Sequence, residues 1–139
     1  MTGHRPAFTL VELLIVVVII GILAAIAIPK FANTKEKAYF ATMKADLRNV
    51  ASAQEGYAAD NGGSYATGPA TGPAAIPGLG FAPSTGVTME VTATATGWSA
   101  VATMAQTPRK CGMFLSKSEP PSAPGGTNPA IRSGEPQCN

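Results

Sequence analysis

Residues 8–29 read FTLVELLIVVVIIGILAAIAIP and hold a single charged side chain, that of Glu12. A helix rises about 1.5 Å per residue, so a stretch of this length can cross a hydrocarbon core of roughly 30 Å. Apolar residues occupy every face of such a helix, which is typical of a helix that lies in lipid or among other helices. The stretch therefore predicts a membrane-spanning or bundle-core helix near the N-terminus.

The rest of the chain has a different composition. Of 139 residues only 13% are charged, about half of the share usual in a soluble domain, and the deficit is concentrated in residues 8–29. Residues 30–139 are polar and rich in Ala, Thr, Gly and Pro. The formal net charge of +2 is far from the strongly basic balance that contacts with phosphate backbones require. The composition argues against a soluble cytoplasmic enzyme, and it allows a nucleic-acid partner without indicating one.

Two interpretations of the apolar stretch leave Glu12 unexplained. A secretory signal peptide would use His4 and Arg5 as its charged head and would be cleaved after Ala27. A plain membrane anchor would keep the whole stretch. Neither needs a carboxylate, which costs on the order of a few kcal/mol in hydrocarbon.

A third interpretation supplies a partner for Glu12. If the chain is cut between Ala7 and Phe8, Phe8 gains an amino group that is mostly protonated at neutral pH. This cation lies four residues from Glu12, which is one helical turn and the same face. The pair could form within one chain or between neighbours, and pairing between chains would also fix their axial register.

The stretch from Phe8 to Pro29 closely resembles the N-terminal segment of type IV pilins and of the related pseudopilins. The resemblance implies that a membrane-embedded prepilin peptidase removes residues 1–7 as a leader and that the new N-terminal Phe8 is N-methylated. It also implies that Glu12 pairs with the N-terminal amine of a neighbouring subunit during assembly. The family usually has Gly before the cut, where this chain has Ala7.

The charges that flank the apolar stretch point to the opposite membrane orientation. Three lysines, beginning with Lys30, follow the stretch, while only His4 and Arg5 precede it. The positive-inside rule would place the C-terminal side in the cytoplasm. The resemblance implies the reverse, with the leader inside and the remainder outside, and we follow it.

Cys111 and Cys138 are the two cysteines of the chain. Their position near the end of a polar region predicts a single disulfide formed in an oxidising compartment, with two unrelated free thiols as the alternative. A bridge would stabilise the fold by about 3–4 kcal/mol on the chain-entropy model. Residues 116–139 hold five prolines and few apolar side chains, so this segment is not expected to order by itself. Its placement resembles the disulfide-bounded C-terminal loop of many type IV pilins.

Residues 30–59 are expected to continue the helix in amphipathic form. Its apolar side chains form one stripe along the helix, and charged residues, Asp46 among them, are expected on the other faces. Pro29 and Gly21 are predicted to kink the helix or to melt it locally. The stripe is expected to pack on the chain's own C-terminal sheet and could also line a filament core. Its members, spaced three and four apart, are Phe40, Met43, Leu47, Val50, Gln54 and Tyr57.

The C-terminal part predicts a sheet. Residues 60–85 are expected to form a helix-to-sheet loop without a regular element, because they repeat Ala-Thr-Gly-Pro. Residues 86–139 are expected to form the sheet and the C-terminal loop. The fold class is therefore α+β, a long N-terminal helix on a three- to four-stranded antiparallel sheet, as in the pilin fold. The strands are expected at 87–95, 98–106 and 111–115, with a turn at Thr96-Gly97 and with Val87, Met89 and Val91 facing inward.

No catalytic or cofactor site is expected. The single histidine, His4, lies in the leader, and no cluster of residues has metal-site spacing. We therefore expect a structural subunit of a type IV pilus, which starts as an inner-membrane precursor and joins an extracellular helical filament for motility or adhesion. Its expected partners are further copies of itself, the prepilin peptidase and the pilus assembly machinery. The alternatives are a type II secretion pseudopilin and a membrane-anchored extracellular binding module.

Overall fold

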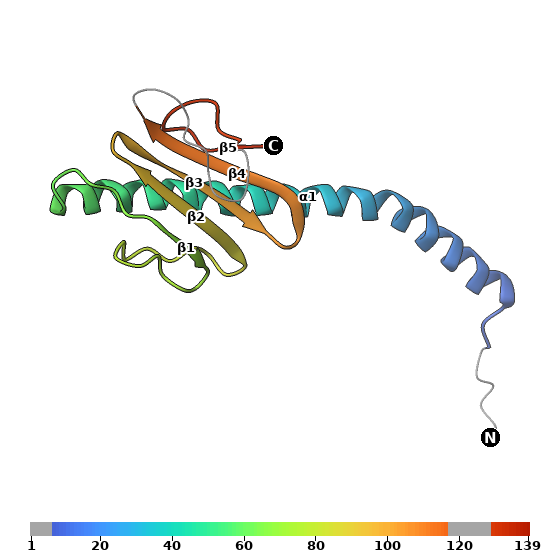
Figure 1. The fold of residues 1–139 in the computed structure, drawn as a ribbon. Helices are drawn as coiled ribbons and strands as arrows, with labels where there is room; N and C mark the ends of the chain where they lie inside the picture. The colour runs from blue at the N-terminus through green and yellow to red at the C-terminus, as the bar shows by residue number, and fades with distance from the viewer. Residues whose placement is uncertain (1–6, 117–128) are drawn as a thin grey trace, which may run out of the picture. The chain divides into compact units, whose positions relative to one another are not determined.

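The computed structural model describes residues 7–116 and 129–139 and contains one helix and one sheet (Figure 1). The chain divides into two compact units, Met1–Glu36 and Lys37–Asn139, and the helix α1 contributes to both. The elements are α1 (Leu10–Asp60), β1 (Gly68–Thr71), β2 (Val87–Thr94), β3 (Gly97–Met104), β4 (Thr107–Ser116) and β5 (Gln137–Cys138).

The helix α1 covers almost all of the predicted range, 8–59, and begins two residues later than expected. It continues without interruption through Gly21 and Pro29. Proline removes one hydrogen bond to the carbonyl four residues earlier, while the bonds on either side of it remain. Local melting at these two residues therefore stays a prediction for the assembled state.

The sheet is antiparallel, in the order β1-β2-β3-β4-β5. Its three long strands confirm the predicted ones, although their ends differ. The first turn lies at Ala95-Thr96, because Gly97 already pairs with Thr94. The strand β4 begins at Thr107 and not at the expected residue 111, because a bulge opposite Thr103 and Met104 accommodates the proline that follows Thr107.

Two short edge strands are absent from the prediction. The expectation that residues 60–85 hold no regular element is wrong, because β1 lies within this range and pairs with β2. Pro69 fits there, since an edge strand does not need every amide for pairing. At the other edge, β5 pairs with Cys111 and Gly112 of β4. Both strands are too short to show a period of two in the sequence.

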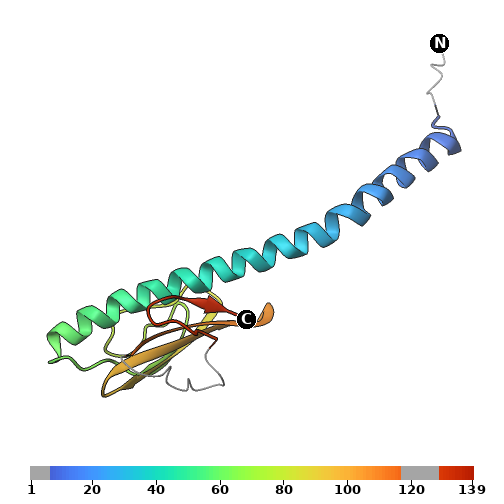
Figure 2. The same cartoon turned by 90° about the horizontal axis from the view of Figure 1, so that it is seen from above.

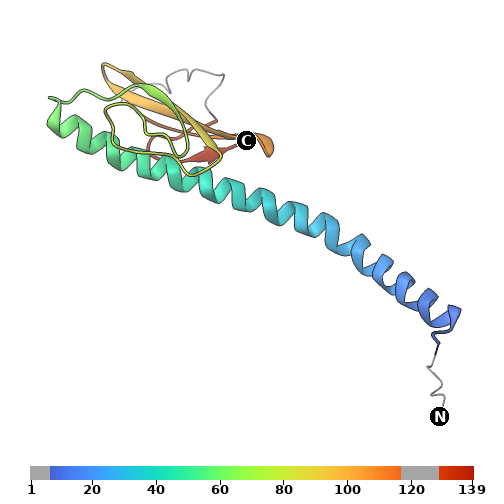
Figure 3. The same cartoon turned by 90° about the horizontal axis from the view of Figure 1, so that it is seen from below.

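The core lies between the second half of α1 and one face of the sheet, and Figures 2 and 3 show the two layers from opposite sides. The predicted inward side chains of β2 are buried, as are Trp98 and its neighbours on the same face of β3. Phe40 and Tyr57 pack at the margins. The fully buried apolar side chains include Met43, Leu47, Val50, Ile76, Val87, Met89, Ala100, Ala102 and Cys111.

Two polar residues of α1 belong to this core: Gln54, which was expected in the stripe, and Asp46, which was not. Asp46, which was expected on an exposed face, is only 3% exposed. Its carboxylate oxygens accept hydrogen bonds from the backbone amide and the hydroxyl of Ser84, at 2.8 and 2.9 Å. Gln54 is fully buried; its amide donates to the carbonyl of Ala66 at 2.7 Å and its oxygen accepts from the Ala66 amide at 2.9 Å. These bonds fix the loops on both sides of β1 to the helix.

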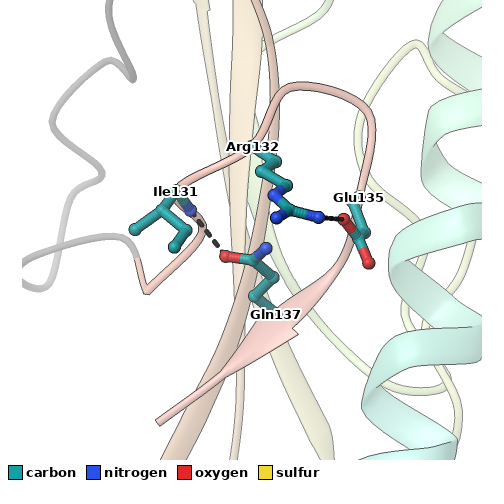
Figure 4. A network of polar contacts seen from close by, with 4 residues as sticks. All are labelled: Ile131, Arg132, Glu135 and Gln137. Atoms are coloured by element: carbon teal, nitrogen blue, oxygen red, sulfur yellow. Dashed lines mark hydrogen bonds and ion pairs between the residues drawn. The ribbon is translucent and has the colours of Figure 1, made fainter.

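The disulfide Cys111–Cys138 and several hydrogen bonds hold the last residues against the sheet. Gly134 donates its amide to the carbonyl of Phe114 at 2.8 Å. Within this segment Ile131 donates its amide to Gln137, and Arg132 pairs with Glu135 at 3.7 Å (Figure 4). The contacts agree with the expectation that this segment needs external support, although residues 117–128 lie outside the described part of the chain.

Gly72 lies in a close approach that admits no side chain. A Cβ built there would overlap the backbone carbonyl oxygens of Pro83 and Ser84. We expect Gly72→Ala to lower the free energy of unfolding by about 1–3 kcal/mol, because backbone must move to relieve the overlap.

The measurement is urea unfolding of the detergent-solubilised chain, followed by the fluorescence of Trp98, which is 1% exposed. Gly56→Ala is the matched control. A Cβ at Gly56, inside α1, meets no atom within 4 Å, so this variant should be more stable by up to about 1 kcal/mol. Equal stability of the two variants would contradict the packing argument.

Candidate processing and assembly site

The predicted cleavage point lies immediately before the helix. Ala7, Phe8 and Thr9 precede the first helical residue, Leu10. Phe8 is 87% exposed, so the Ala7–Phe8 bond lies in exposed, non-helical backbone. The predicted leader charges, His4 and Arg5, lie outside the described residues.

Glu12 has a local partner that the sequence analysis missed. Its Oε2 accepts hydrogen bonds from the backbone amide and the hydroxyl of Thr9, both at 2.8 Å, while its own amide donates to the Thr9 hydroxyl at 3.2 Å. This reciprocal arrangement is a capping box, in which Thr9 is the N-cap residue and Glu12 is the third residue of the helix. The Thr-x-x-Glu spacing was the signal that could have revealed it.

The capping box leaves Glu12 able to bind a cation. Its Oε1 makes no hydrogen bond within the part of the chain that the structure describes. Cleavage before Phe8 would keep both partners of the box, because the Thr9 amide and hydroxyl are unaffected. The positive end of the helix dipole also favours a carboxylate in the first turn. The site therefore pairs a fixed carboxylate with a position, Phe8, where cleavage would create an amine.

The first part of α1 exposes its apolar side chains to a degree unusual for a protein in water. From Phe8 to Phe31, every large apolar side chain is half or more exposed. By length and composition α1 is able to cross a membrane, a test that a signal sequence near the N-terminus also passes. Exposed apolar area of this extent indicates a surface that lipid or other helices cover.

The other predicted site residues belong to other parts of the chain. Gly21 and Pro29 lie further along α1, and Cys111 and Cys138 form their disulfide in the sheet. Among residues 7–116 and 129–139, no group of three His, Cys, Asp or Glu side chains is placed to hold a metal ion.

Comparison with known proteins finds one family model and several relatives that match part of this chain. Residues 4–28 match the family model of the prokaryotic N-terminal methylation motif. The type II secretion system core protein G of Pseudomonas aeruginosa is 41% identical over 58 residues, which is 42% of this chain and 41% of that protein. The type IV major pilin protein PilA of Myxococcus xanthus is 44% identical over 54 residues, 39% of this chain and 24% of that protein.

A third relative is the type IV narrow pilus major component PilA5 of Thermus thermophilus, 52% identical over 50 residues, which is 36% of this chain and 43% of that protein. The chain thus spans less than half the length of these curated relatives. No solved structure matches it. The chain therefore carries the N-terminal methylation motif and is similar, over part of its length, to type IV pilins and to type II secretion core protein G.

Proposed function

We propose that this chain is the structural subunit of a type IV pilus, made as an inner-membrane precursor and polymerised through α1 into a helical surface filament. The observation that carries the proposal is the apolar first part of α1, which is exposed on all sides and has its one carboxylate, Glu12, held in the first turn. A helix of this kind needs lipid before assembly and other helices after it.

Processing would convert the site into a self-complementary one. A prepilin peptidase would cut between Ala7 and Phe8, and Phe8 would then be N-methylated, which leaves the amine positively charged. In a low-dielectric bundle an unpaired charge is costly, so the amine of one subunit would seek Glu12 of another. Contacts of this head-to-tail kind do not close on themselves, and they produce a helical filament.

The apolar side chains would provide most of the affinity. Burial of apolar surface is worth about 25 cal/mol per Å², and neighbouring copies of α1 would cover one another along residues 8–31. Gly21 and Pro29 would be the weak positions at which the helix melts when the filament forms or stretches. The charge pair would then select one register among the many that apolar packing alone permits.

A second candidate is a pseudopilin of a type II secretion system. The 41% identity to core protein G of Pseudomonas aeruginosa supports it, and the assembly physics is the same. The disulfide-bounded C-terminal segment favours the pilus subunit. A membrane-anchored binding module that never polymerises is the remaining alternative.

The test is the N-terminal sequence and the intact mass of material sheared from the cell surface. We expect abundant filaments whose subunits begin at a methylated Phe8. Processed chain that stays in the cell envelope, with no surface filaments, would favour the pseudopilin. Uncleaved monomer in the membrane would favour the binding module.

Replacement of Ala7 provides a direct test of processing. We expect Ala7→Phe to accumulate as membrane-bound precursor, because a bulky side chain next to the scissile bond cannot occupy a site shaped for a small one. Ala7→Gly should be processed at least as well as the natural chain. Immunoblots of the precursor and mature bands give the readout. Normal processing of Ala7→Phe would show that the chain is not cleaved between Ala7 and Phe8.

A further inference from the structure

The Met1–Glu36 unit ends in a cationic surface that the proposed function does not use. Lys30 directly follows Pro29, where the uncharged stretch ends, and Lys30, Phe31 and Lys35 are all exposed. Phe31 is 64% exposed, and the Nζ of Lys35 lies 5.3 Å from the centre of its ring. We call Lys30, Phe31 and Lys35 the boundary surface.

The three residues share one side of α1. At 100° per residue their positions fall within an arc of about 140°. Ala27 and Thr34 complete a shallow hollow with Lys30 and Phe31, and the Thr34 hydroxyl already donates to the carbonyl of Lys30 at 2.9 Å. The hydrogen-bond donors left on this side are therefore the two lysine ammonium groups.

These ammonium groups have no anionic partner among the residues that the structure describes. Neither Lys30 nor Lys35 makes an ion pair with any residue in 7–116 or 129–139. Two unpaired cations beside an exposed aromatic ring, at the end of a membrane-length apolar helix, are complementary to a layer of anionic groups that lies next to hydrocarbon. Long lysine side chains extend from such positions into the headgroup region.

We propose that the boundary surface binds the headgroup of an anionic phospholipid in the outer leaflet, with the ammonium groups of Lys30 and Lys35 on its phosphate and Phe31 among the upper acyl carbons. The inference rests on the proposed function, because it requires that residues 8–29 span the membrane. Lipid binding at this surface also explains why lysines follow the apolar stretch, on the non-cytoplasmic side, where the positive-inside rule predicts few positive charges. A bound lipid would hold the subunit at a fixed depth until a neighbouring helix displaces it.

The test uses the full chain in nanodiscs made of equal parts phosphatidylglycerol and phosphatidylcholine. The lipids that stay with the protein after mild detergent extraction are counted by mass spectrometry. Each lysine near an anionic surface contributes about a fivefold preference, so phosphatidylglycerol should be enriched between about fivefold and about 25-fold. The double variant Lys30→Gln, Lys35→Gln should lose this enrichment, and Lys44→Gln, further along the same helix, should keep it.

Several results would overturn the inference. Unchanged enrichment in the double variant would show that the boundary surface does not bind the lipid. An equal loss of enrichment in Lys44→Gln would show that only the net charge of the chain matters. Displacement of the lipid by inorganic phosphate or glycerol phosphate would make the ligand a free anion. Membrane insertion is scored separately by carbonate extraction: a chain that leaves the membrane overturns the proposed function as well, whereas an embedded chain without enrichment overturns this inference alone.

Discussion

Glu12→Gln should abolish pilus assembly while the chain remains in the membrane. Glutamine can replace glutamate in a capping box, so the hydrogen bonds from Thr9 should survive and the start of α1 should stay intact. The negative charge is lost, and the N-terminal amine of the neighbouring subunit would have to be buried without a partner. Removal of one partner from a buried ion pair costs about 3–5 kcal/mol, which is on the order of a hundredfold to several thousandfold in affinity at each contact.

The measurement compares sheared surface filaments with the membrane pool by immunoblot. Glu12→Ala removes both the charge and the cap, and it should also fail to assemble. Thr9→Ser keeps the capping hydroxyl and should assemble normally. If Glu12→Gln produced filaments at the natural level while Glu12→Ala did not, then Glu12 would serve only to cap the helix, and the charge pair would have to be abandoned.

Gln54→Leu should have the largest effect on the stability of the sheet-bearing unit. Leucine fits the apolar surroundings, but it leaves the amide and the carbonyl of Ala66 without partners in a buried place. Each buried, unsatisfied backbone group costs about 1–3 kcal/mol, so the loss should be roughly 2–6 kcal/mol. Urea unfolding followed by Trp98 fluorescence measures it.

Two further variants separate hydrogen bonding from shape in this test. Gln54→Glu keeps an acceptor for the Ala66 amide but places a second oxygen against the Ala66 carbonyl, so it should also destabilise the unit. Glu55→Gln, at an exposed neighbouring position, should change the free energy of unfolding by less than about 0.5 kcal/mol. If Gln54→Leu also changed the free energy of unfolding by less than about 0.5 kcal/mol, water would have to replace the lost hydrogen bonds of Ala66.

The sequence predicted the elements whose burial repeats along the chain. The second half of α1 and the strand β2 show periods of about three and a half and of two, and most of the buried side chains are the predicted ones. On α1, Asp46 and Ala58 are buried in addition. The burial of Asp46 and the hydrogen bonds of Gln54 were not predicted, because their partners are Ser84 and main-chain atoms of Ala66, which are distant in the chain. No spacing in the sequence indicates which main-chain group a buried polar side chain will contact.

The candidate site was predictable in part. The position of Glu12 in an apolar stretch identified this residue as important. Its hydrogen bonds with Thr9 were not predicted, although the Thr-x-x-Glu spacing of a capping box is present in the sequence. The edge strand β1 was missed for a different reason. Four residues with a proline carry no periodic signal, and the strand exists only because β2 offers an edge with which Gly68–Thr71 can pair.

The bond between Gln54 and Ala66 has a consequence for how this part of the molecule can diverge. The hydrogen bonds of Gln54 go to main-chain atoms of Ala66, which almost any amino acid would offer in the same place. The loop after α1 can therefore exchange many of its residues over evolutionary time without losing its attachment. Identity to relatives over less than half of the chain is compatible with such divergence, because a contact with main-chain atoms can persist while the side chains of the loop change.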